Sequence, residues 1–173
     1  MMEQQPNLEH VQLPERFPIS VMLERRVSTN QWIDNTWEAV GVSVGIRSQD
    51  EGRKVVVVSE EAEVSRFLYE GFYIHLYRDE CESYYHNLIS PQPRCFVVAD
   101  PDDLGQPTPL LVSLSFDEAN AYLEGEEIVY AVDIPPELYR WCETYVLVNY
   151  VPEKKMKRKL TRWISSPTNE TGS

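Results

Sequence analysis

The sequence predicts an α+β fold, with an antiparallel β-barrel or sandwich of about seven or eight short strands and two C-terminal helices. Three observations lead to this prediction. Short apolar segments separated by turn residues fill the first 114 residues, helix signals appear only after them, and no strand–helix–strand alternation precedes that point. With 173 residues, 42% of them hydrophobic, the chain has the size and composition of one domain with a substantial core.

The first three strands are predicted over residues 18–27, 37–44 and 54–59. Side chains alternate between the two faces of a strand, so every second residue faces the core. In the first two strands the residues expected to face inward are Ile19, Val21, Leu23, Val40, Val42 and Val44.

The middle of the chain is expected to continue as strands, over residues 65–78 (one strand, or two interrupted at Gly71), 83–90, 94–99 and 109–116. In the first of these segments one face would carry Phe72, Ile74 and Leu76. In the second, alternation would place Tyr84 and His86 on the same face.

Two helices are predicted near the C-terminus. Ser115, followed three residues later by Glu118, forms a capping-box pattern, and Gly125 is a stop signal, so a helix is expected over residues 116–124. After a strand over residues 128–134, a longer helix should begin at the Pro135-Pro136 pair. Its apolar stripe would consist of Leu138, Trp141, Cys142, Tyr145, Val146 and Asn149. We expect this last helix to cover an open edge or end of the sheet structure.

The charge changes sign near the C-terminus. Residues 151–173 carry six Lys or Arg and two Asp or Glu, a net charge of +4, whereas residues 1–150 carry the other ten and 26, a net charge of −16. The prediction is therefore a flexible arm (1–16), one β-rich domain (17–151) and a basic tail (152–173). The tail is either a solvated end or a partner-docking segment. The residues that would contact a partner are Lys154, Lys155, Lys157, Arg158, Lys159, Arg162 and Trp163.

Several function classes find no support in the sequence. Glycine-rich phosphate loops and a G-x-S-x-G motif are absent, and Cys81, Cys95 and Cys142 have no metal-ligand spacing with the histidines. We expect no catalytic residue, no cofactor and no metal. The acidic body disfavours nucleic-acid binding. The N-terminus lacks a secretory pattern and no apolar run reaches ~20 residues, so we expect a cytoplasmic protein without membrane contact. The sequence leaves the oligomeric state open.

Two clusters are candidate ligand sites. Tyr84 and His86 would line a polar pocket or contact surface, and Arg25 and Arg26, close to two tryptophans, would form a cation–π patch or an anion-binding site. For both clusters the more common alternative is structural packing.

Long segments of the chain resemble an uncharacterised family of small bacterial proteins. The similar segments are residues 17–26, 30–32, 37–42, 71–80, 82–88, 117–119, 135–137 and 150–155. Genes of this family lie close to those of molybdenum- or tungsten-dependent formate dehydrogenases, and some members carry the label of a molybdopterin-guanine dinucleotide synthesis protein. The chain lacks the N-terminal glycine-rich loop of nucleotidyltransferases with that label, and the family implies no catalytic residues.

The resemblance implies an accessory or assembly factor for a molybdopterin-dependent formate dehydrogenase, which binds an enzyme subunit or a maturation factor. The alternatives are a binding module for a small ligand, such as the pterin cofactor or a precursor, and an enzyme with an unrecognised site.

Overall fold

The computed structural model describes residues 13–32, 35–45 and 52–150. Its strands are β1 (Arg16–Val27), β2 (Asn35–Val44), β3 (Lys54–Glu60), β4 (Val64–His75), β5 (Arg94–Pro101), β6 (Pro107–Ser113) and β7 (Ile128–Asp133). Its helices are α1 (Cys81–Ile89), α2 (Phe116–Leu123) and α3 (Pro136–Asn149), and the 3₁₀ turn η2 (Arg78–Glu80) precedes α1.

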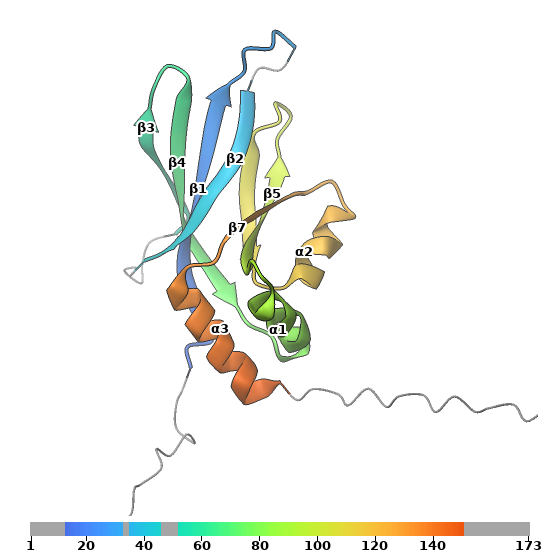
Figure 1. Cartoon of the computed structure of the whole chain (residues 1–173). Coiled ribbons are helices and arrows are strands. Elements are labelled where there is room, and N and C mark those ends of the chain that lie inside the picture. Colours follow the sequence, from blue (N-terminus) through green and yellow to red (C-terminus); the bar gives the residue numbers. More distant parts are fainter. Residues whose placement is uncertain (1–12, 33–34, 46–51, 151–173) are drawn as a thin grey trace, which may run out of the picture.

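The described strands form two open antiparallel sheets, of order β2-β1-β4-β3 and β6-β5-β7. The sheets adjoin where β2 lies beside β7 and β4 beside β6, and the three helices lie towards one end (Figure 1). The mixed α+β class with antiparallel strands is confirmed. Because neither sheet closes on itself, the arrangement is sandwich-like.

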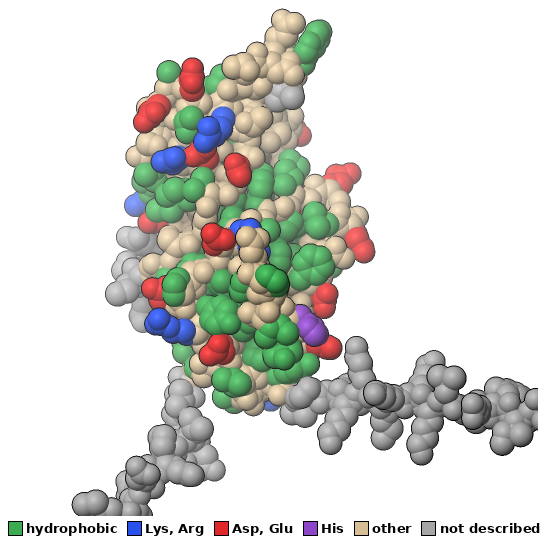
Figure 2. Space-filling model, in the orientation of Figure 1, with side chains coloured by type: hydrophobic (Ala, Val, Ile, Leu, Met, Phe, Trp, Pro, Cys, Tyr) green, Lys and Arg blue, Asp and Glu red, His purple; other side chains and the backbone are tan. Residues whose placement is uncertain are grey.

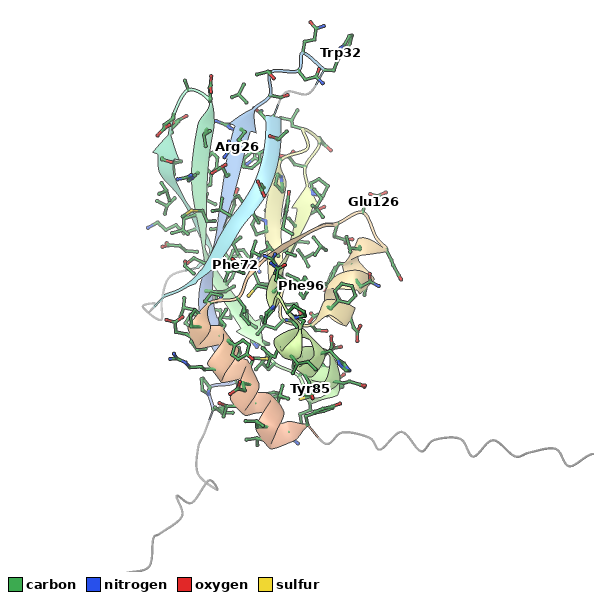
Figure 3. All side chains as sticks on the ribbon, viewed as in Figure 1. Arg26, Trp32, Phe72, Tyr85, Phe96 and Glu126 are labelled. Atoms are coloured by element: carbon green, nitrogen blue, oxygen red, sulfur yellow. The ribbon has the colours of Figure 1, made fainter. Side chains whose placement is uncertain are left out.

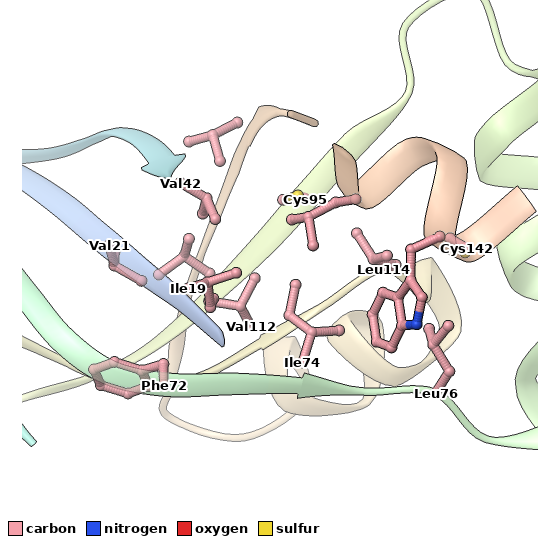
Figure 4. Packing of buried hydrophobic residues seen from close by; sticks show 14 of the residues in the cluster. Ile19, Val21, Val42, Phe72, Ile74, Leu76, Cys95, Val112, Leu114 and Cys142 are labelled. Atoms are coloured by element: carbon pink, nitrogen blue, oxygen red, sulfur yellow. The ribbon is translucent and has the colours of Figure 1, made fainter. Parts of the chain in front are cut away.

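One hydrophobic core joins both sheets to α1 and α3 (Figure 4). The inward residues expected in β1 are buried, since Val21 and Leu23 are fully inaccessible and Ile19 is 3% exposed. Leu138 and Cys142 extend the core into α3. The last helix therefore covers one end of the sandwich, as the sequence predicted (Figure 1).

Irregularities in the strands explain where simple alternation fails. Val40 was expected to face inward, but it is 50% exposed, and the buried residues of β2 are Ala39 and Val42. Opposite Val40 the register shifts between Met22 and Leu23, so an extra residue bulges out of β2 and changes which side chains face the core.

The strand predicted around Gly71 is continuous. Gly71 has a positive φ of 98°, which a residue without Cβ adopts at low cost, and β4 gains one residue relative to β1 at this point. The shift moves the buried positions from Tyr69 to Phe72 and Ile74, so both halves of β4 face the core.

The strand predicted over residues 83–90 is wrong, because this segment is the helix α1. Cys81, Tyr84 and Leu88 are buried at helical spacing. The chain leaves the helix at Ser90, whose backbone is extended as expected before a proline. The molecule therefore has three helices in the described part rather than the two expected.

The two C-terminal helices are confirmed. The side chain of Ser115 accepts a hydrogen bond from the Glu118 backbone N–H (3.0 Å), which is the N-cap half of a capping box. The Glu118 carboxylate accepts from the Ser113 hydroxyl instead of from the Ser115 backbone. In α3 the predicted stripe faces the core, and the indole N–H of Trp141 donates to the carbonyl of Pro14 (2.9 Å). This bond attaches the segment just before β1 to α3. The rest of the predicted N-terminal arm, residues 1–12, lies outside the described residues.

Candidate functional site

A cavity of about 340 Å³ opens between α1, the start of β5 and the start of α2. The rings of Phe96 and Phe116 meet edge to face with centroids 5.8 Å apart and form an apolar wall. The polar lining residues are Ser83, His86, Asn87, Ser90, Gln92, Arg94 and Asp117. An apolar wall with a few polar groups is typical of small-ligand pockets, and the volume lies near the lower limit of their range of roughly 300–1,000 Å³.

Asn87 connects the elements that surround this cavity through three side-chain hydrogen bonds. Its side-chain amide donates to the carbonyls of Arg94 (2.8 Å) and Leu114 (2.9 Å), and its oxygen accepts from the Arg94 backbone N–H (3.0 Å). The side chain is buried and uses both its donors and its acceptor. Asn87 therefore connects α1 to the start of β5 and the end of β6.

Three buried serines, Ser83, Ser113 and Ser115, lie at the N-terminal end of α2. Ser115 hydrogen-bonds the Glu80 carboxylate and lies 3.0 Å from the Ser83 hydroxyl, while Ser113 donates to Glu118 (2.7 Å). The Ser115 hydroxyl accepts from the Glu118 backbone N–H (3.0 Å), and the Ser83 hydroxyl accepts from the Asp117 backbone N–H (3.3 Å). The network therefore caps the N-terminal end of α2.

The two residues proposed from the Tyr84–His86 segment lie in different environments. Tyr84 is in the core, where its hydroxyl accepts from the Tyr77 backbone N–H (3.1 Å) and burial raises its pKa. His86 is exposed at the rim of the cavity, with Nε2 3.7 Å from the Glu82 carboxylate. Strand alternation would have placed them on one face, whereas the helix separates them.

Arg26 lies far from the cavity residue Phe96, towards the other end of the molecule (Figure 3), and Arg25 precedes it on β1. The guanidinium of Arg25 lies 6.0 Å from the Trp37 ring centroid and 5.6 Å from that of Phe67, so one of the expected cation–π contacts is present. Trp32, by contrast, is 85% exposed. A ligand the size of the cavity does not contact both proposed clusters.

Arg26 and Arg66 bind the same carboxylate. Glu24 receives the Nε–H groups of Arg26 (2.7 Å) and Arg66 (2.9 Å), one on each oxygen. The hydrogen bond from Arg66 is the largest of the effects that lower the pKa of Glu24, and it outweighs the desolvation that opposes it. Arg26 is therefore occupied by a structural ion pair on β1.

The three cysteines are buried and unpaired. Burial raises the pKa of each thiol, to about 12 for Cys142, and for Cys81 the Asp79 charge is a secondary cause. A protonated, buried thiol is a poor nucleophile, so these residues act as core side chains. In residues 13–32, 35–45 and 52–150, no three His, Cys, Asp or Glu side chains cluster as metal ligands would.

A second concave surface lies at the C-terminal end of α3. A groove of about 470 Å³ runs between α3 and the segments around residues 13–15 and 75–78. Val148 and Tyr77 line it and are 72% and 51% exposed, and Leu147, which precedes Val148 in α3, is 77% exposed. We call Tyr77, Leu147 and Val148 the α3-end surface. Figure 2 shows further apolar side chains over the neighbouring part of α1 and α3.

Sequence reasoning missed the α3-end surface, although a signal was present. Leu147 and Val148 are apolar but lie off the helical stripe that packs into the core, so a helix ending there must expose them. On the side facing α1, Tyr150 stacks on Tyr85 with ring centroids 5.4 Å apart. The predicted docking residues Lys154 to Trp163 lie outside the described residues, and the chain enters that basic segment directly after Tyr150.

Within the described part of the chain, no helix has the length and apolar character needed to span a bilayer.

The comparisons with known proteins identify a family and nothing narrower. No curated protein matches the chain, and no solved structure matches it. A family model described as "Protein of unknown function (DUF3305)" matches residues 18–159. This agrees with the expected membership of an uncharacterised family. The match covers most of the sequence, so the chain belongs to the family of proteins of unknown function DUF3305.

Proposed function

We propose that this protein is a non-catalytic cytoplasmic accessory or assembly factor that binds another protein through the α3-end surface and the basic segment that follows it. The observation that carries the proposal is the exposure of Leu147 and Val148 beside a groove, on the last turns of the helix that leads into that segment. Apolar side chains rimmed by polar ones are typical of protein contact sites.

Charge and position support a partner with an acidic surface beside an apolar one. The segment after Tyr150 has a net charge of +4 and begins at the α3-end surface, so one partner would contact both. Charge complementarity accelerates association and selects among partners, and buried apolar contacts supply affinity. The family resemblance makes a molybdopterin-dependent formate dehydrogenase subunit or one of its maturation factors the first partner to test.

The test is quantitative co-purification of the tagged full-length protein from its native cells grown with formate and molybdate. We expect formate dehydrogenase subunits or maturation proteins in the eluate of the unaltered protein. We expect them to be absent from the eluates of the double variant Leu147→Asp/Val148→Asp and of a chain ending at residue 152. Leu123→Asp on α2, where the native side chain is 51% exposed, is the matched control. Thermal unfolding of each variant establishes that the domain is intact.

Two results would contradict the proposal. One is an eluate that contains this protein alone, and the other is partner capture that persists in both altered proteins. If truncation at residue 152 unfolds the domain, the basic segment is structural and the role assigned to it is wrong.

A second function, binding of a small ligand such as the pterin cofactor or a precursor, is favoured by the cavity beside His86. The exposed face of Phe116 offers a stacking surface for a planar ring, and His86 supplies a nearby polar group. A ligand that binds the native state raises the melting temperature. We expect a shift with the pterin that is reduced in Phe116→Ala and His86→Ala, and no shift at saturating concentration would exclude this function.

A further inference from the structure

Among the described residues, β3 is an open edge of the four-stranded sheet. It pairs with β4 along one side, and among the described elements β4 is its main neighbour, whereas β2 at the opposite edge lies beside β7 (Figure 1). A free edge presents backbone N–H and C=O groups that can pair with another strand.

The side chains of this edge are unusually apolar. Val55, Val57 and Val58 are 55%, 54% and 50% exposed, and Val56 is half-buried. Edge strands usually carry charges or proline within the strand, which discourage pairing with another chain. Here the charged residues occur only at the two ends of the strand, at Lys54 and Glu60.

The two ends carry opposite charge. Lys54 is at the start of β3, and Glu60 at its end is followed by Glu61 and Glu63 in the turn. All four are exposed, and no ion pair joins any of them to another described residue. A parallel neighbour of the same sequence would align like charges, whereas an antiparallel one would place Lys54 near the glutamates.

From this pattern we propose that β3 pairs antiparallel with β3 of a second copy, giving a two-fold symmetric dimer with a continuous eight-stranded sheet. The interface lies away from the α3-end surface, so it is independent of the proposed partner site (Figure 1). An interface of this kind is self-complementary, because each copy contributes the same positive and negative ends.

The register follows from the bulge in β3. Pairing with β4 shifts between Val57 and Ser59, which makes Val58 the extra residue and leaves a regular edge over residues 54–57. A pairing centred on Val56 places Val55 opposite the second copy's Val57 in two symmetric pairs. It also brings Lys54 beside Ser59 and within reach of Glu60 in the other copy. Directly opposite residues share a face, so the exposed valine side chains cover one another.

The regular pairing is short, so we expect a weak dimer with a dissociation constant in roughly the micromolar range. Sedimentation velocity of the full-length chain from about 1 to 500 µM measures it. Val57→Lys should raise the dissociation constant at least about tenfold, because it replaces the apolar contact with Val55 of the second copy by a charged side chain. Val40→Lys is the matched control, since Val40 is 50% exposed, close to the 54% of Val57, but lies on β2.

Charge exchange tests the antiparallel register. Lys54→Glu and Glu60→Lys should each weaken self-association, and an equimolar mixture of the two variants should associate more tightly than either alone. The double variant should regain the wild-type dissociation constant. A monomer throughout the concentration range, equal effects of Val57→Lys and Val40→Lys, or no recovery in the mixture would overturn the proposal.

Discussion

At the helical end of the molecule polar side chains are buried and fully hydrogen-bonded, whereas at the opposite end of the larger sheet valine side chains are exposed on a free edge. Asn87 and Ser115 at the first end have saturated hydrogen-bonding groups. Val55 and Val57 at the second are more than half exposed. Both regions belong to one domain, yet only one of them is covered by helices.

The difference distinguishes residues that stabilise the fold from residues whose surface is available to a partner. A buried, saturated polar group is costly to remove and has no remaining donor or acceptor for a partner. An exposed valine on the open edge adds little to the free energy of unfolding. Burying it against a partner removes apolar surface from water, which favours association. We therefore expect substitutions at the helical end to change folding, and substitutions at β3 to change association.

The largest effect is expected at Asn87. Asn87→Ala removes three hydrogen bonds and leaves the carbonyls of Arg94 and Leu114 without this donor, at a cost of about 4 kcal/mol in the free energy of unfolding. Urea denaturation measures the change. His86→Ala, one residue earlier on the exposed face of α1, is the control and should change stability by less than about 0.5 kcal/mol. Similar losses in the two variants would show that the amide does not anchor α1.

A second substitution compares core packing with the free edge. Leu138 is fully inaccessible, so Leu138→Ala should cost about 3 kcal/mol through lost burial and the cavity that remains. Val57→Ala, measured by the same denaturation experiment at a concentration too low for self-association, should cost less than about 0.5 kcal/mol. Equal costs would mean that β3 contributes to the core as much as α3 does.

Local patterns predicted the fold where contacts close in sequence decide it. The alternation of Ile19, Val21 and Leu23 is confirmed, and so is the helix start capped by Ser115, since a strand face and a helix start depend on neighbours a few residues away. Val40 was misplaced because a bulge depends on the partner strand, which one segment does not reveal.

The helix α1 was missed for a related reason. Tyr84 and Tyr85 favour strands, and they mask the helical spacing of Cys81, Tyr84 and Leu88. The bonds that stabilise this helix in place reach Arg94 and Leu114, up to 27 residues away. The predicted ligand site was wrong for the same reason, because a strand would have placed Tyr84 and His86 on one face. The cavity arises only when α1, β5 and α2 meet, so no local pattern predicts it.

The smallest effect concerns pH and the electrostatic part of the larger sheet. Arg66 and Arg26 hold the pKa of Glu24 below its ordinary value of 4.5. The unfolded chain therefore binds a proton at Glu24 before the folded chain does as the pH falls. The ion pair contributes fully at neutral pH, and its contribution declines from about pH 4.5 downward through the folded pKa.

Glu24→Gln should accordingly destabilise the protein at pH 7 and have progressively less effect as the pH falls below 4.5. Urea denaturation of both proteins across this range measures the difference. Glu143→Gln on α3, an exposed carboxylate outside the described ion pairs, is the control. A Glu24→Gln effect that is independent of pH would mean that the side chain acts through packing. If the destabilisation by Glu24→Gln declines with falling pH while that by Leu138→Ala does not, the two ends differ in what stabilises them. Charge pairs would then stabilise the outer face of the larger sheet, and apolar packing would stabilise the helical end.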